Sequence, residues 1–185
     1  MNINIDISNK LFNTERLKLR PWELTDLEDF YEYSKVDGVG QMAGWLPHKN
    51  IQESRNILEH FIKNKNVLAI EYNGKVIGSI GLHNYNEKKW PEFENLKCKE
   101  IGYVLSKDYW GLGIMPEAVK EIIRYMFEDE KLDILFCGYF KFNSQSKRVQ
   151  EKCGFTYYSD QEITTLSGIT HDGVINILRK EDWIK

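Results

Sequence analysis

A strand-like run, a turn with two glycines and a helical run follow one another near the middle of this chain. Residues 101–105 read IGYVL, residues 111–113 read GLG, and residues 117–128 have strong helical character. Glycines let a backbone approach an anion closely, and the first N–H groups and the dipole of a helix point toward it. The order therefore predicts a strand-to-helix connection with a candidate phosphate site at Gly111 and Gly113.

Two common nucleotide-binding patterns do not fit this turn. No Gly-Lys-Ser/Thr follows it, so no side chains are placed for the terminal phosphates and Mg²⁺ of a nucleotide. The dinucleotide pattern needs a third glycine three positions after Gly113, where Pro116 stands. On local sequence, a plain tight turn and a site for another phosphate ligand both stay open.

Composition narrows the class of protein. With 185 residues, 42% of them hydrophobic, the chain is expected to form one folded domain over residues 1–185. The net charge of -3 argues against a dedicated nucleic-acid binder, and no run of about 18 apolar residues predicts a membrane span. The three cysteines, Cys98, Cys137 and Cys153, have no metal-ligand spacing. We therefore expect reduced thiols, no metal site and a cytoplasmic location.

Hydrophobic periodicity predicts alternating strands and helices. The expected strands cover residues 16–20, 67–72, 75–82, 98–105, 133–140, 155–158 and 173–178, and the expected helices cover residues 25–33, 52–63, 115–127 and 144–152. Asn73-Gly74 between two strands is a strong hairpin signal. The sequence thus predicts a mixed α/β fold. An antiparallel meander comes first, and the helical crossover between Leu105 and Asp133 then adds a parallel pair.

Polar residues stand at two further element boundaries. Glu100 leads the strand that feeds the glycine turn, and burial in a cleft would raise its pKa toward the range of a general base. On a half-buried strand the same side chain can instead point into solvent. Asn143 or Ser144 is a natural N-cap, and Gly154 a natural C-cap, for the helix at residues 144–152.

These segments together resemble one family, the Gcn5-related N-acetyltransferases, and within it the branch that acetylates ribosomal protein N-termini. The similarity covers nearly the whole chain. It runs through residues 14–21 (TERLKLRP), 78–82 (GSIGL), 100–105 (EIGYVL), 109–118 (YWGLGIMPEA), Asn143 with Ser146, residues 154–155 (GF) and residues 178–183 (LRKEDW). The order and spacing of these pieces carry the resemblance, and no single piece does.

The resemblance implies acetyl-CoA as the cofactor. Its pyrophosphate is expected on the backbone of the turn, at Trp110, Gly111, Leu112, Gly113, Ile114 and Met115. The pantetheine is expected in a gap between the strand that ends at Val104-Leu105 and the strand at residues 133–140, where it pairs with the backbone like an added strand. Asn143 and Ser146 are expected to face the thioester. The family prefers Arg or Gln where Asp108 stands, so the Asp108 side chain is expected to turn away.

The resemblance also implies direct acetyl transfer in a ternary complex. Glu100 is the expected base for a primary amine, directly or through water, and a backbone N–H near Leu105 is expected to polarise the thioester carbonyl. Many family members protonate the leaving thiolate with a tyrosine, but that position here is Gln150. Ser146, or a water that it holds, is therefore the expected proton donor, and Asn143 completes the expected catalytic group.

The acceptor is the least constrained part of this interpretation. Its expected binding wall consists of Trp45, His48, Tyr85 and Trp90, with ordinary packing of these side chains as the alternative. His83 and His171 are runner-up bases.

Several acceptors and roles stay open. The amine of a ribosomal or other protein N-terminus is one acceptor, and a polyamine, an amino acid or an antibiotic amine is the alternative. A non-catalytic acyl-CoA-binding sensor is a third possibility. The chain is expected to act as a monomer or homodimer, without nucleic acid or membrane as partner.

Overall fold

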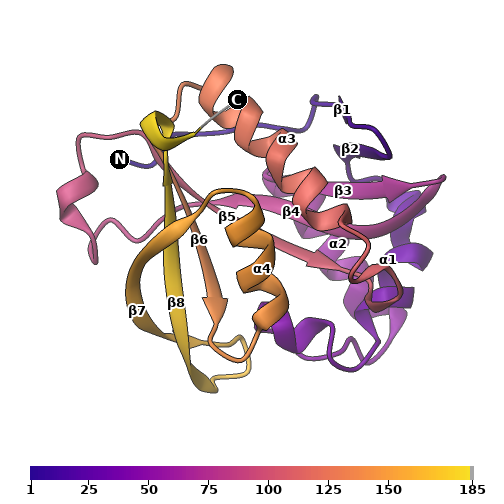
Figure 1. Ribbon diagram of the computed structural model, residues 1–185. Helices are drawn as coiled ribbons and strands as arrows, with labels where there is room; N and C mark the ends of the chain where they lie inside the picture. The colour runs from indigo at the N-terminus through magenta and orange to yellow at the C-terminus, as the bar shows by residue number, and fades with distance from the viewer. Residues whose placement is uncertain (184–185) are drawn as a thin grey trace.

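One mixed sheet of eight strands organises the computed structural model, which describes residues 1–183 (Figure 1). The strands are β1 (Phe12–Asn13), β2 (Leu17–Pro21), β3 (Val67–Tyr72), β4 (Lys75–His83), β5 (Cys98–Leu105), β6 (Ile134–Phe140), β7 (Thr156–Thr164) and β8 (Thr170–Arg179). Their order in the sheet is β1-β2-β3-β4-β5-β6-β8-β7. The predicted mixed α/β fold is confirmed, with the antiparallel meander first and the parallel pair at β5 and β6.

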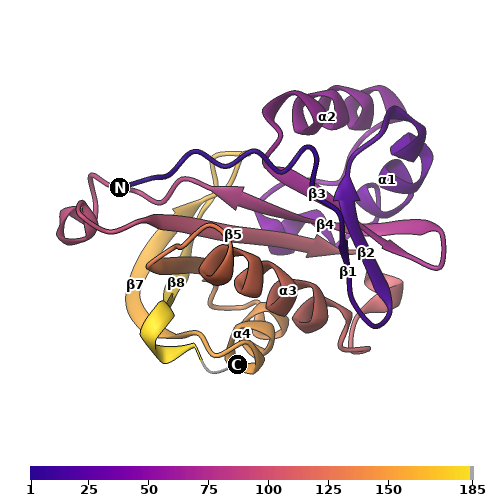
Figure 2. The same ribbon diagram turned by 90° about the horizontal axis from the view of Figure 1, so that it is seen from above.

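Helices cover both faces of the sheet. Figure 2 shows α1 (Leu27–Ser34) and α2 (Ile51–Asn64) on one face, and α3 (Ile114–Glu128) and α4 (Ser144–Lys152) on the other. Each pair buries its own apolar cluster, one around Phe30 and Leu58 and one around Ile122 and Met126. Within residues 1–183, no helix is long and apolar enough to cross a bilayer.

Local signals place the β3–β4 hairpin as predicted. Asn73 and Gly74 have φ values of 51° and 78°. Two consecutive positive φ angles are what a tight hairpin turn needs, and Asn-Gly supplies them at low steric cost. The hairpin fixes β4 beside β3, and β4 in turn carries β5 along its length, from the pair His83–Glu100 to the pair Gly78–Leu105.

The parallel pairing of β5 and β6 is short. Its register joins Cys98 to Ile134, Lys99 to Leu135, and Glu100 to Phe136, and in the described residues it extends no further. Beyond these pairs β5 follows β4, while β6 follows β8 as far as the pair Phe140–Gly173. Because the sheet twists, two strands held by different neighbours diverge. The sheet therefore opens directly after Glu100.

The last hairpin is longer than the sequence predicts. Strands were expected at residues 155–158 and 173–178, and the structure has Thr156–Thr164 and Thr170–Arg179. The outer half of β7 is largely exposed, and the register shifts between Tyr157 and Ser159. An exposed edge strand interrupted by a bulge has no regular apolar alternation, so periodicity did not reveal it.

Phe136 anchors the loop between β4 and β5 to the sheet. It is fully buried, and its ring lies 5.3 Å from the ring centroids of Tyr85, Trp90 and Phe93. The first two rings are stacked on it, and Phe93 meets it edge to face. Aromatic contacts of this kind add to the stabilisation from burial.

We predict that Phe136→Ala lowers the free energy of unfolding by about 3–5 kcal/mol, because it removes a buried ring and leaves a cavity. Urea denaturation followed by far-UV circular dichroism measures the change. Tyr157→Ala on β7 is the control, since that side chain is 65% exposed, and its effect should stay within about 0.5 kcal/mol. A loss below about 1 kcal/mol for Phe136→Ala would contradict the role assigned to it.

Candidate active site

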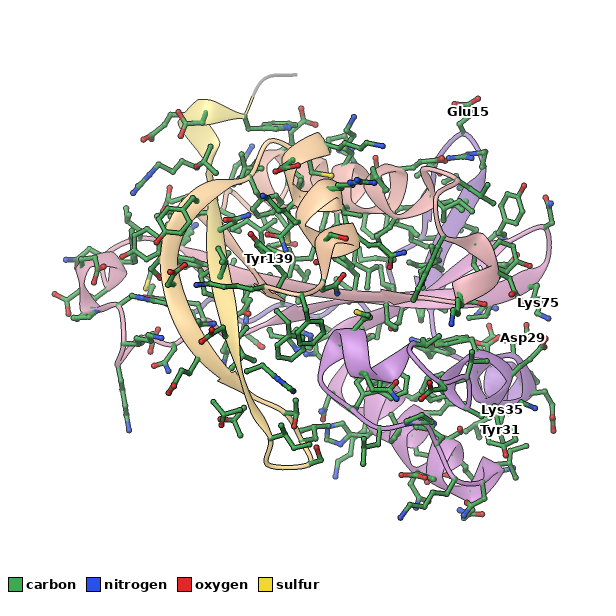
Figure 3. The ribbon with its side chains drawn as sticks, turned by 60° about the horizontal axis from the view of Figure 1, so that its bottom comes forward. Glu15, Asp29, Tyr31, Lys35, Lys75 and Tyr139 are labelled. Carbon is green, nitrogen blue, oxygen red and sulfur yellow. The ribbon has the colours of Figure 1, made fainter. Side chains whose placement is uncertain are left out.

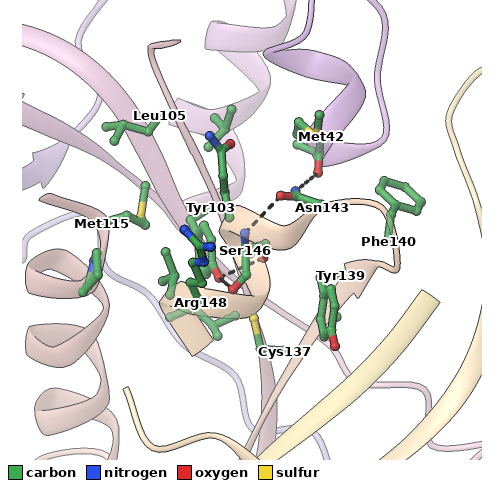
Figure 4. Close-up of a pocket in the computed structure, with 18 of the residues that line it drawn as sticks. Met42, Tyr103, Leu105, Met115, Cys137, Tyr139, Phe140, Asn143, Ser146 and Arg148 are labelled. Atoms are coloured by element: carbon green, nitrogen blue, oxygen red, sulfur yellow. Dashed lines mark hydrogen bonds between the residues drawn. The ribbon is translucent and has the colours of Figure 1, made fainter. Parts of the chain in front are cut away.

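A cavity of about 570 Å³ occupies the opening between β5 and β6. Most of its walls come from the free part of β5, the glycine turn with the start of α3, the end of β6, and α4, and further lining residues come from β4, from β7 and from the segment between α1 and α2. Figure 4 shows this arrangement, with Leu105 and Met115 on one side, Tyr139 and Phe140 on the other, and Ser146 between them. Glu100, the glycine turn and the pair Asn143 and Ser146, which are separate candidates in the sequence, thus line one cavity.

Glu100 lies where the two strands part. It is the last β5 residue paired with β6, it lines the cavity, and burial raises its pKa to about 7. Gly138 on β6 lies beside this carboxyl group, since a Cβ there would be in ordinary contact with Glu100 Oε1 at 3.5 Å. A carboxyl group with a pKa near neutrality can accept a proton and release it again at physiological pH.

His83 is the cross-strand partner of Glu100 and also lines the cavity. Its ring lies over two glycines, since a Cβ at Gly81 would be 2.8 Å from His83 Nε2 and one at Gly102 would be 3.3 Å from it. Restricted hydration, with a smaller contribution from the positive charge of Lys99, lowers the pKa of His83. His83 therefore stays a runner-up base. His171 does not line the cavity and packs edge-on against Phe140 and Phe142.

The glycine turn leaves the start of α3 open. Gly111 and Gly113 have φ values of 79° and 75°, a region that other residues adopt only at a cost. No side chain of the described residues caps the helix at Gly113. Trp110 holds the turn to β5, because its Nε1 donates to the carbonyl of Leu105 over 2.9 Å. The first N–H groups of α3 thus keep the capacity to bind an anion.

Asn143 is committed to two structural hydrogen bonds. Its Oδ1 accepts from the backbone N–H of Ser146 over 3.0 Å, which confirms the predicted N-cap of α4. Its Nδ2 donates to the carbonyl of Met42 over 3.1 Å, in the short helix Gly40–Ala43 between α1 and α2 (Figure 4). Asn143 therefore joins α4 to the opposite side of the cavity.

The hydroxyl group of Ser146 lies in a small polar cluster. Gln150 Nε2 donates to Ser146 Oγ over 3.2 Å, and the Tyr103 hydroxyl lies 3.0 Å from the same oxygen. Asn176 Nδ2 donates to Gln150 Oε1 over 2.9 Å, which orients the amide of Gln150 toward Ser146. Burial raises the pKa of Tyr103 well above its usual value, so this phenol is protonated at neutral pH. Tyr103 is a site residue that the sequence did not single out.

Most residues expected to hold the cofactor meet at the cavity. Val104, Leu105, Trp110, Gly111, Gly113, Ile114, Met115, Asn143 and Ser146 all line it. Leu112 does not, and its side chain is 55% exposed. Asp108 is exposed in the turn before Trp110 and is not among the lining residues.

The four residues expected as an acceptor wall do not line the cavity. Tyr85 and Trp90 are stacked on Phe136. His48 is buried, with its Nδ1 2.7 Å from Ser54 Oγ, and the Trp45 ring packs against the His48 ring. Each side chain is already held by packing, which corrects the expectation.

Other residues line the part of the cavity where the acceptor wall was expected. They are Val39, Met42 and Ala43 between α1 and α2, Tyr139 and Phe140 of β6, and Ile163 of β7. The wall was missed because Ile163 belongs to the part of β7 that periodicity did not reveal. Met42 and Ala43 fall in a glycine-marked loop without a local chemical signal.

Comparisons with known proteins identify the family and the fold. A sequence profile described as an acetyltransferase (GNAT) domain matches residues 16–156. A Bacillus subtilis protein named as a candidate ribosomal N-acetyltransferase, YdaF, is 32% identical over 114 residues, which cover 60% of this chain and 58% of that protein. The match thus spans less than two thirds of the length of that relative.

Solved structures show the same fold. A GNAT-family acetyltransferase from Bacillus anthracis has a TM-score of 0.80 at 22% identity, over 93% of this chain and 99% of that one. The microcin self-immunity acetyltransferase MccE, crystallised with acetyl-CoA and AMP, has a TM-score of 0.73 at 21% identity, over 89% and 93% of the two chains.

Proposed function

The chain belongs to the GNAT acetyltransferase family, and from that premise we propose that it moves an acetyl group from acetyl-CoA to a primary amine by direct transfer in a ternary complex. The observation that carries the proposal is the position of Glu100. A half-buried carboxyl group with its pKa raised to about 7 stands where β5 and β6 part, in a cavity that continues to the glycine turn.

The residues around the cavity fit acetyl-CoA. Gly111 has open space where a side chain would stand, so an anion can approach the backbone there. The start of α3 offers uncapped N–H groups for a pyrophosphate. The edges of β5 and β6 that face the opening lack strand partners among the described residues, and an extended pantetheine can pair with such an edge. When bound, acetyl-CoA supplies an activated thioester.

Glu100 is proposed as the base. A primary amine is mostly protonated at neutral pH and attacks only after losing a proton. The Glu100 carboxylate takes that proton, directly or through water, and the cavity holds the amine beside the thioester. Positioning of this kind lowers the entropic part of the barrier, and general base catalysis adds about 10²–10⁴-fold.

Ser146 is proposed as the donor of the proton that the leaving thiolate takes. A serine oxygen accepts two hydrogen bonds and donates one. When Gln150 and Tyr103 both donate to Ser146 Oγ, the Ser146 proton passes to the leaving thiolate, Ser146 Oγ takes the proton of the Tyr103 hydroxyl in its place, and solvent then reprotonates Tyr103. The cluster around Ser146 thus provides the acid that Gln150 cannot provide itself.

The proposed acceptor is the N-terminal amine of a ribosomal or other protein, acting in the cytoplasm. The name of the Bacillus subtilis relative supports this choice. The site supports it as well, because Glu100 is the one carboxyl group among the described lining residues and the cavity is also lined by the apolar side chains of Val39, Met42 and Ile163. A single amine with an apolar neighbour suits such a site, whereas a polyamine would leave further charges without a carboxylate partner.

An acceptor screen tests the function. The protein is incubated with acetyl-CoA and a panel of N-terminal peptides of ribosomal proteins, amino acids, polyamines and antibiotic amines. We expect a mass increase of one acetyl group on peptides with a free N-terminus, and none on the same peptides blocked at that amine. Binding of acetyl-CoA without turnover on any amine would favour a sensor domain, and turnover on small amines alone would exclude the peptide acceptor.

We predict that Glu100→Gln lowers kcat by about 10²–10⁴-fold, because the amide cannot take a proton. In the wild type the pKa of Glu100 is raised to about 7. The carboxyl group is therefore protonated and inactive below pH 7, and kcat should rise as pH passes through that value. The variant should lose this rise. Glu59→Gln, on the exposed side of α2, is the control with an unchanged profile. Loss of the rise in His83→Gln instead of Glu100→Gln would assign the base to His83.

We predict that Ser146→Ala lowers kcat by about 10- to 100-fold, less than the loss of the base, because solvent can also protonate a thiolate. Steady-state kinetics with the acceptor from the screen measures the effect. Ser144→Ala is the matched control, since Ser144 is exposed in the same helical turn and lies outside the cavity lining. Equal kcat values for the wild type and Ser146→Ala would remove Ser146 from the mechanism.

A further inference from the structure

The turn between β1 and β2 reaches the first turn of α3. Glu117 accepts hydrogen bonds from three groups there: the Thr14 hydroxyl at Oε1, the backbone N–H of Arg16 at Oε1 over 2.9 Å, and Arg16 Nε at Oε2 over 2.7 Å. Arg16 Nη1 also donates to the carbonyl of Leu112 over 3.0 Å. We call Thr14, Arg16 and Glu117 the clasp. None of these residues is assigned a role in the mechanism above.

The clasp contacts the most adaptable part of the cofactor site. Leu112 lies between Gly111 and Gly113, and a segment with two glycines has many accessible backbone conformations. The peptide bond is planar and trans, so its C=O and the following N–H point in opposite directions. When Arg16 holds the carbonyl of Leu112, it directs the N–H of Gly113 to the other side of the turn.

The clasp also keeps Glu117 ionised and neutralises its negative charge at the start of α3. A carboxylate in the first turn of a helix competes with an anion for the same N–H groups and the same dipole. Burial opposes ionisation of Glu117, but hydrogen bonds from Thr14 and Arg16 outweigh it and hold the pKa of this carboxyl below its usual value. Glu117 is therefore ionised, and the guanidinium of Arg16 neutralises it at the place where a phosphate would bind.

We propose that Arg16 and Glu117 are positioning residues that hold the Gly111–Gly113 turn in its phosphate-binding form and so set the affinity for the pyrophosphate end of the acetyl donor. The proposal rests on the proposed function, because it takes acetyl-CoA as the donor. It assigns no contact with the reacting atoms to either residue. The effect should therefore appear in donor binding and leave the chemical step unchanged.

A comparison of two acetyl donors distinguishes this positioning role from a general effect of the substitution on folding. Acetyl-CoA carries the pyrophosphate, and acetylpantetheine carries the same thioester without it. For Arg16→Gln we expect the Kd for CoA, measured by isothermal titration calorimetry, and the KM for acetyl-CoA to rise on the order of 10-fold. The kcat with acetyl-CoA and the kcat/KM with acetylpantetheine should not change.

Further variants isolate the clasp. Arg16→Lys keeps the positive charge but loses the planar fork that spans Glu117 and Leu112, so it should also weaken CoA binding. Because the two residues act together, Arg16→Gln/Glu117→Gln should lose no more affinity than Arg16→Gln alone. Glu15→Gln is the matched control. It removes a carboxylate from the same turn, and Figure 3 shows that Glu15 projects away from the molecule.

The outcomes are distinct. Three results together support the proposal. The loss of affinity in Arg16→Gln is confined to acetyl-CoA and CoA, the double variant binds CoA no more weakly than Arg16→Gln, and Glu15→Gln binds CoA like the wild type. An equal loss with both donors, a greater loss of CoA affinity in the double variant than in Arg16→Gln, or unchanged CoA affinity in Arg16→Gln would overturn it. A wild-type protein that binds no CoA and acetylates no amine would instead overturn the proposed function, and is recognised before any variant is measured.

Discussion

The short pairing between β5 and β6 is the constraint on which the site depends. Both strands are bonded along their outer edges, β5 to β4 and β6 to β8, and these long antiparallel ladders set their directions. Only three register pairs, ending at Glu100 and Phe136, hold the strands to each other. A sheet that opened earlier would expose Glu100 to bulk water. One that opened later would leave no room for a ligand between the strands.

The chemistry of the site follows from the same opening. Glu100 is half-buried at the closed end, and this burial is the cause of its raised pKa. The hydroxyl groups of Ser146 and Tyr103 come from the two separate sides of the opening, α4 and β5, and meet across it. One geometric feature of the sheet, its opening after Glu100, therefore accounts for the proposed base, the proposed acid and the space between them. The glycine turn then continues that space to the start of α3.

The sequence predicts these features to different extents. Features set by neighbouring residues are predictable, and features set by residues far apart in the chain are not. Asn73-Gly74 and the N-cap at Asn143 could be predicted because a few neighbouring residues determine them. For Glu100 the strand pattern left two possibilities open, a buried candidate base and a solvent-facing side chain, and only the resemblance of several segments to a family favoured the first. Tyr85 and Trp90 were misplaced because nothing local says that Phe136, some 50 positions away, already holds their rings. The hydrogen bonds between Arg16 and Glu117 join residues 101 positions apart, and no sequence pattern marks such a pair.

The bridge from Asn143 has a consequence for how such a protein can diversify. The segment between α1 and α2 is fixed to the rest of the site through main-chain carbonyls, that of Met42 to Asn143 and that of Gly44 to the backbone N–H of Leu166. Any residue can present a carbonyl, so these two hydrogen bonds do not depend on the side chains of Met42 and Gly44, while Val39 in the same segment is buried in the apolar cluster. If this segment binds the acceptor as proposed, side chains there that line the cavity can change while the hydrogen bonds that attach the segment stay in place. A scaffold attached in this way can take up new acceptors without first losing the site for its donor.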